Sequence, residues 1–168
     1  MEETILHSRR SGSAQEHEYL KGHRHRLAES LTMIPKAESE EASCLDIGCD
    51  RYMAFWAWRY LGYANVEGIE MRPGEFAEMV RDVEINGERL TFHVHNFDIS
   101  QLEWPLDGTF DTLLFFETLE HLTQDPSGVM LNVTKRMTPV STLVISVPNA
   151  VSYKTLQELM TGAPPWTH

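Results

Sequence analysis

The sequence predicts an α/β protein, a doubly wound and mostly parallel sheet with helices on both faces. Short apolar runs alternate along the chain with segments of helical periodicity, which is the order that produces parallel strands joined by right-handed crossovers. The first apolar run, residues 43–47, contains Asp46 and is followed by Gly48 and an aromatic-rich segment. This pattern is typical of a buried strand, a tight turn and the first turn of a helix.

Composition predicts one ordinary domain. The chain has 168 residues, and residues 14–168 are expected to form a single domain behind a flexible arm at 1–13. The net charge of −11 disfavours nucleic acids and anionic membranes as partners. No apolar run approaches the length of a membrane span, and Cys44 and Cys49, the only cysteines, lie too far apart along a strand to bridge. We therefore expect a cytoplasmic protein.

The periodicity places an N-terminal helix at 14–35 and an α/β core at 43–162. Further helices are expected at 51–62, 73–85, 126–137 and 151–161, with a short one at 117–122. Strands are expected at 43–47, 65–69, 90–95, 110–115 and 141–147. Asp50 is predicted to cap the second helix, Pro73 to begin the third, and Asn86-Gly87 to end it.

Ligands of open α/β sheets bind beyond the carboxyl ends of the strands, so the turn after residue 47 is the first candidate site. A pyrophosphate-binding turn there would need Gly-x-Gly-x-x-Gly, but only Gly48 is present, and the later positions hold Asp50 and Tyr52. Three acids follow strand ends or lie near them: Asp46, Glu70 and Asp98. An acidic rim favours a ligand that has no phosphate and carries positive charge and ribose hydroxyls.

A set of short motifs supports this interpretation. In chain order they are Leu45-Asp46-Ile47-Gly48-Cys49, Glu70, Asp98, Phe110-Asp111, Glu120-His121-Leu122 and Val147-Pro148-Asn149. With these motifs the chain resembles the class I S-adenosylmethionine-dependent methyltransferases over about residues 17–160. The N-terminal helix, with His23 and Arg26-Leu27, is similar to the small-molecule branch of that family. The resemblance implies a Rossmann-like sheet of the methyltransferase type, which in this chain is expected to lack its last two strands.

The resemblance also implies S-adenosylmethionine as cofactor and a role for each motif. Asp46 and Gly48 would border the methionine moiety, with Asp50 in the same turn where the family usually has glycine. Glu70 would accept the two ribose hydroxyls. Asp98 would receive the adenine amino group, with Phe97 or Ile99 near the ring, and Glu117 would face both cofactor and substrate.

The implied reaction moves a methyl group to a small-molecule acceptor through an oxygen, nitrogen or carbon nucleophile. His121 is the candidate base where the acceptor must lose a proton, because an imidazole titrates near neutral pH. Glu117, one helical turn away, would orient it. Neither Glu117, Glu120 and His121 nor His93 and His95 reach the ligand count of a zinc site, so no metal is expected.

Two features leave alternatives open. Tyr52 and the aromatics that follow it either crowd the cofactor's amino-acid end or form the inner face of a core helix. Residues 143–147 would be an exposed apolar edge, which suggests a fragment of a longer protein or a homodimer that covers this edge. The alternative function is a non-catalytic module that keeps the fold and binds a partner.

Overall fold

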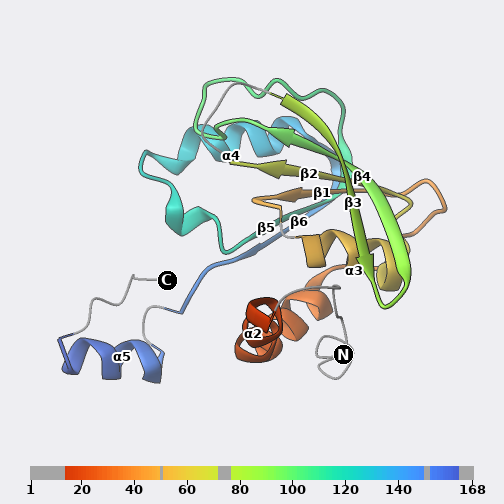
Figure 1. Ribbon diagram of the computed structural model, residues 1–168. Coiled ribbons are helices and arrows are strands. Elements are labelled where there is room, and N and C mark those ends of the chain that lie inside the picture. The colour runs from red at the N-terminus through yellow and green to blue at the C-terminus, as the bar shows by residue number, and fades with distance from the viewer. Residues whose placement is uncertain (1–13, 50, 72–76, 150–151, 163–168) are drawn as a thin grey trace.

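The computed structural model describes residues 14–49, 51–71, 77–149 and 152–162 (Figure 1). The expectations for residues 1–13, Asp50 and Pro73 lie outside these ranges. The helices are α2 (Ala14–Met33), α3 (Arg51–Leu61), the 3-10 turn η1 (Leu119–His121), α4 (Pro126–Lys135) and α5 (Tyr153–Met160). The strands are β1 (Ser43–Ile47), β2 (Asn65–Glu70), β3 (Ala77–Ile85), β4 (Glu88–Asn96), β5 (Phe110–Phe116) and β6 (Met137–Ser146).

The six strands form one sheet in the order β3-β4-β2-β1-β5-β6. β1 lies near the centre and pairs in parallel with β2 and β5, while β4 and β6 extend the parallel sheet on either side. Of the strands described, only β3 runs antiparallel. The predicted α/β class with a mostly parallel, Rossmann-like sheet is confirmed.

Each face of the sheet has its own hydrophobic core. In β1, Cys44 belongs to the core beneath α2 and α3, whereas Leu45 and Ile47 belong to the core beneath α4. This division follows from the alternation of side chains along a strand. Figure 1 shows α3 and α4 on opposite faces of the sheet, as the doubly wound prediction requires.

The predicted helix at 73–85 is wrong over its described part, because residues 77–85 form β3. Asn86 and Gly87 have φ values of +54° and +79° and join β3 to β4 as a two-residue hairpin in which Ile85 pairs with Glu88. Positive φ at both central residues is the type I′ geometry that Asn-Gly favours. The dipeptide thus turns a hairpin, and the chain around it alternates with a period of two.

β6 is longer than the predicted 141–147 and carries an irregular start. Its register against β5 shifts between Phe110 and Thr112, and Pro139 lies in the shifted stretch. Proline is tolerated at such bulges and on edge strands. β6 is at one edge of the described sheet, and Val140 and Ile145 are exposed on it. That a second copy of the chain covers this edge stays a prediction.

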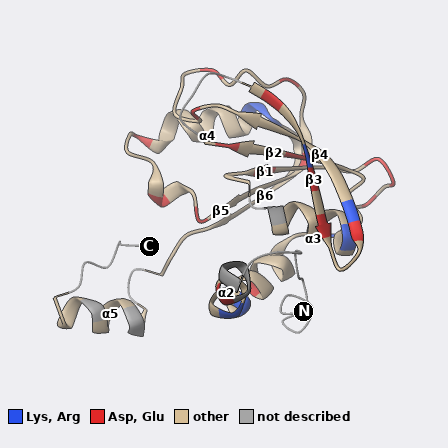
Figure 2. Cartoon of the chain, viewed as in Figure 1, with Lys and Arg blue, Asp and Glu red and all other residues tan. Residues whose placement is uncertain are grey.

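Acidic residues are spread over most elements, and β3 carries both signs (Figure 2). Cys44 and Cys49 form no disulfide. Burial, and secondarily the Asp46 carboxylate, raise the pKa of the Cys44 thiol well above its usual value, so this thiol stays protonated. Among the helices described, none combines the length and apolar character needed to cross a membrane.

Candidate functional site

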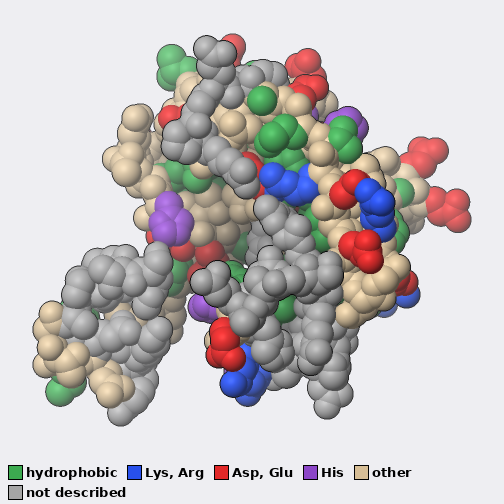
Figure 3. All heavy atoms as spheres, viewed as in Figure 1, with side chains coloured by type: hydrophobic (Ala, Val, Ile, Leu, Met, Phe, Trp, Pro, Cys, Tyr) green, Lys and Arg blue, Asp and Glu red, His purple; other side chains and the backbone are tan. Residues whose placement is uncertain are grey.

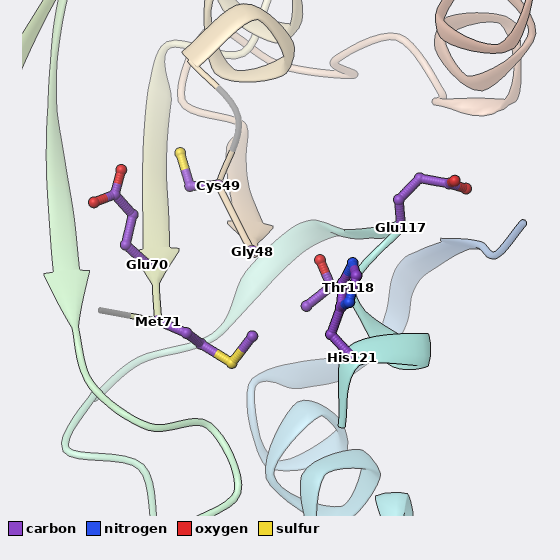
Figure 4. A pocket seen from close by; sticks show the side chains of 7 residues that line it. All are labelled: Gly48, Cys49, Glu70, Met71, Glu117, Thr118 and His121. Carbon is purple, nitrogen blue, oxygen red and sulfur yellow. The ribbon is translucent and has the colours of Figure 1, made fainter. Parts of the chain in front are cut away.

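A pocket of about 300 Å³ opens beyond the carboxyl ends of the central strands. Its walls come from the turn after β1, the end of β2 and the segment between β5 and η1 (Figure 4). The lining residues are Gly48, Cys49, Glu70, Met71, Glu117, Thr118 and His121. The pocket therefore lies where the sequence places it, at the end of β1.

Gly48 shapes the floor of the pocket. Its φ is +79°, and a Cβ there would collide with the Thr118 hydroxyl and lie 2.9 Å from Thr118 Cγ2. The amides of Gly48 and Cys49 both donate to the Ile69 carbonyl, at 3.0 and 2.8 Å. These two N–H groups are thus engaged within the fold, whereas a phosphate-binding turn directs such groups at the ligand.

Glu70 ends β2 and lines the pocket wall. Its side chain is 11% exposed and forms an ion pair with Arg81 of β3, which is 13% exposed. The hydrogen bond to Glu70 is the main cause that raises the pKa of the Arg81 guanidinium. In Figure 4 the Glu70 carboxylate extends toward the neighbouring strand of the sheet.

Glu117 follows β5 in the left-handed region, with φ +48°. Its carboxylate lies 2.6 Å from Arg26 of α2 and accepts a 2.9 Å hydrogen bond from Ser146 Oγ, while its amide donates to the Ser146 carbonyl at 3.0 Å. In Figure 4 the side chain points away from the other labelled groups. Glu117 therefore joins α2 to the end of β6.

His121 stands at the rim of the pocket, with its side chain 61% exposed. Its amide donates to the Thr118 carbonyl at 3.1 Å, and its Nε2 lies 3.9 Å from Glu120 Oε1. Glu117, expected to orient this imidazole, instead contacts Arg26 and Ser146. The orienting contact is not among those of the described residues.

The pocket wall does not include all three strand-end acids. Asp46 is buried within the sheet and is not part of the pocket wall. Asp98 is exposed, and its Oδ1 accepts hydrogen bonds from the Ser100 amide and hydroxyl, at 2.9 and 2.7 Å. Phe97 is buried against Trp104, with ring centroids 5.8 Å apart. Of these residues only Glu70 lines the pocket.

Tyr52 is buried in the core beneath α2 and α3, with its ring 5.5 Å from that of Trp56. It does not line the pocket. The aromatic face of α3 is therefore the inner face of a core helix, which was the second of the two alternatives for this segment.

Sequence reasoning missed Met71, Thr118 and Arg81. Arg81 had a signal: alternation along 77–85 on one side of Asn-Gly predicts a strand whose inward row includes it. Thr118 and Met71 carry no comparable signal, because only the folded backbone brings them to the pocket. Within the described chain, no three His, Cys, Asp or Glu side chains are arranged to hold a metal ion.

A family model described as a methyltransferase domain matches residues 17–167. None of the curated proteins compared with the chain matches it. The matched region includes the whole sheet and every residue that lines the pocket. The sheet order, the turn at Gly48 and the family match agree, and the chain belongs to the class I S-adenosylmethionine-dependent methyltransferase family.

Proposed function

We propose that this protein transfers a methyl group from S-adenosylmethionine to the oxygen, nitrogen or carbon nucleophile of a small molecule. One observation carries the proposal: a buried carboxylate, Glu70, ends β2 in the wall of a pocket beside the Gly48 turn. A carboxylate at this place can accept hydrogen bonds from both hydroxyls of a ribose.

The residues present fit such a nucleoside better than a dinucleotide. The Gly48 and Cys49 amides are already bonded to Ile69, so they offer no cradle for a pyrophosphate. A volume of about 300 Å³ matches the lower end of the usual range for small-molecule sites. Glu70 would hold the ribose, and Gly48 and Cys49 would border the methionine end.

S-adenosylmethionine, when bound, supplies a methyl group made electrophilic by the attached sulfonium. The chain's own task is to hold an acceptor in line behind that methyl and to exclude water, which alone lowers a barrier substantially. His121 would take the proton of an acceptor that must lose one, since it lies at the rim with most of its imidazole exposed. Glu117 would fix α2 and β6 around the acceptor side of the pocket.

Calorimetric titration with S-adenosylhomocysteine and S-adenosylmethionine tests the proposal, with NAD as a parallel ligand. We expect binding of the first two and not of NAD, and Glu70→Ala should weaken that binding. His121→Ala should leave cofactor affinity unchanged and slow formation of S-adenosylhomocysteine in the presence of small phenols or amines. A folded protein that binds neither sulfur nucleoside would overturn the proposal.

A second candidate, a binding module without catalysis, has a specific observation in its favour. Glu70 is engaged by Arg81, and Asp98, the acid expected at the adenine, is exposed and bonded within its own turn. Such a module would leave both sulfur nucleosides unbound in the same titration.

A further inference from the structure

Arg81 forms an ion pair with Glu70 that the family resemblance did not predict. It enters from β3, the strand that stands where a helix was expected. Along β3, Val83 and Ile85 point into the core beneath α3, and alternation puts Arg81 on the same inward row. The Arg81 guanidinium therefore reaches the end of β2 from the inward-facing, otherwise apolar row of β3.

The register explains how Arg81 reaches its partner. Arg81 pairs with Phe92 on β4, and β4 pairs in parallel with β2, where Glu70 lies beside Asn96. Phe92 and Asn96 lie four residues apart along β4, so the ion pair of Arg81 and Glu70 crosses that strand diagonally, and both side chains are nearly nine-tenths buried. An arginine side chain is long enough to span one strand while its planar fork fixes a carboxylate.

Burial makes the ionisation of Glu70 depend on a nearby cation. A carboxylate removed from water is driven toward its neutral form unless an opposite charge or donors hold it ionised. Among the residues that the structure describes, the groups beside Glu70 include Arg81 from β3, Cys49 from the turn after β1 and Asn96 from β4. Arg81 carries the positive charge among them. An ionised carboxylate has acceptor capacity for Arg81 and for two hydroxyls at once.

We propose that Arg81 is a positioning residue that holds the Glu70 carboxylate ionised and oriented, so that the pocket selects ribonucleosides over 2′-deoxyribonucleosides. This inference rests on the proposed function and deepens it, because it assigns the selectivity of the nucleoside site to the β3–β4 hairpin. The opposite role, a cation that competes with the ligand for Glu70, would give the reverse effect on affinity.

Displacement of S-adenosylhomocysteine by adenosine and by 2′-deoxyadenosine tests the inference. The wild-type protein should favour adenosine by about tenfold, the value of one hydrogen bond to a charged group. Arg81→Met should weaken adenosine by about tenfold and bring the ratio of the two ligands near one. The loss should deepen as the pH is lowered, because a buried carboxyl without that cation takes up a proton more readily.

Two further variants keep the test decisive. Arg81→Lys retains the charge but not the fork, so it should keep the pH profile flat while losing part of the selectivity. Arg89→Met is the matched control, because Arg89 lies on the same hairpin in an exposed ion pair with Asp82. It should leave both affinities unchanged. Figure 3 shows charged side chains of both signs next to one another on the surface in this part of the molecule.

The outcomes separate this inference from the proposed function. If the wild-type protein binds no nucleoside, both fail. If it selects adenosine through Glu70, as Glu70→Gln would reveal, and folded Arg81→Lys and Arg81→Met keep that selectivity and pH profile, only the role of Arg81 is overturned. Tighter binding by Arg81→Met would overturn it in favour of competition. Should Arg81→Met fail to fold, Arg81→Lys decides by its selectivity alone.

Discussion

The two sides of the pocket are held by ion pairs of different kinds. On the β2 side, Glu70 and Arg81 are 11% and 13% exposed and belong to strands of one sheet. On the β5 side, Glu117 and Arg26 are 22% and 32% exposed, and they join a helix to a loop. Glu117 is also held in the left-handed region.

The difference in burial between the two ion pairs indicates which side of the pocket is rigid. The packing around a buried ion pair fixes both side chains in place. Removing one partner leaves the other charge buried and unpaired. A half-exposed pair is screened by water and contributes modestly. We expect the Glu70 side to be a fixed wall that sets ligand selectivity, and the α2 side to be the one that yields when an acceptor enters.

Removing the cation of the buried pair should have the largest effect. Arg81→Met is expected to lower the free energy of unfolding by about 3 kcal/mol, because Glu70 then either keeps an unpaired buried charge or must take up a proton. The double variant Glu70→Gln/Arg81→Met should recover most of that loss, since a neutral pair has no charge to strand. Urea denaturation measures both, and equal losses in the single and double variants would contradict the assignment.

The turn between the two sides comes next. Gly48→Ala should lower the free energy of unfolding by roughly 2 kcal/mol and weaken S-adenosylhomocysteine binding, because of the positive φ and the collision with Thr118. Gly128→Ala is the matched control, since Gly128 lies in α4 with nothing near its Cβ position. It should stabilise by about 1 kcal/mol, measured by the same denaturation.

The partly exposed ion pair of Arg26 and Glu117 should give a smaller effect on stability. Arg26→Met is expected to lower the free energy of unfolding by about 1 kcal/mol and to speed amide hydrogen exchange in α2, because it frees that helix from Glu117. Lys21→Met changes an exposed pair with Glu18 on the same helix, at 4.0 Å, and should change little. A loss as large as that of Arg81→Met would erase the contrast between the two sides.

Asp111 offers a carboxylate at the other end of β5, away from the pocket. It accepts hydrogen bonds from the Ser43 amide and hydroxyl, both at 2.8 Å. The hydrogen bond from the amide is the main cause that lowers the pKa of Asp111 from the usual 3.8. Its stabilising contribution is therefore present above about pH 4 and lost as the pH falls through the depressed pKa. Asp111→Asn should cost less than about 1 kcal/mol at neutral pH.

The pH course gives the measurement for Asp111. The difference in unfolding free energy between wild type and Asp111→Asn should shrink as the pH falls below about 4, because both side chains are then uncharged. Ligand affinity should not change, since Asp111 lies at the opposite end of the strand. A constant difference across this pH range would mean that the carboxylate charge contributes nothing.

Local patterns predicted the parts of the fold that depend on neighbouring residues. β1, the Gly48 turn and the place of Glu70 at the end of β2 follow from short apolar runs and their punctuation. The hairpin at Asn86-Gly87 was missed because the dipeptide was interpreted as a helix stop, although the period-two alternation around it was visible. Here the pairing of β3 with β4 in the folded protein, and not the dipeptide alone, decided the structure.

The rest of the site depends on contacts between residues far apart in the chain. No local pattern indicates that Arg26 meets Glu117, or that Thr118 packs over Gly48. Asp98 follows its strand as predicted, but the Ser100 amide two residues later, not the position, determines where its carboxylate points. Position along the strand was predictable, whereas side-chain partners were not.

The two-residue connection between β3 and β4 has a consequence for the order of folding. Hairpins whose strands adjoin in sequence close within about 1–10 μs, whereas parallel pairing requires long crossovers to form first. β3 and β4 can therefore associate before β4 finds β2. Arg81 would then belong to a hairpin that has already formed. The pairing of that hairpin with β2 would bring Arg81 to Glu70 late in folding.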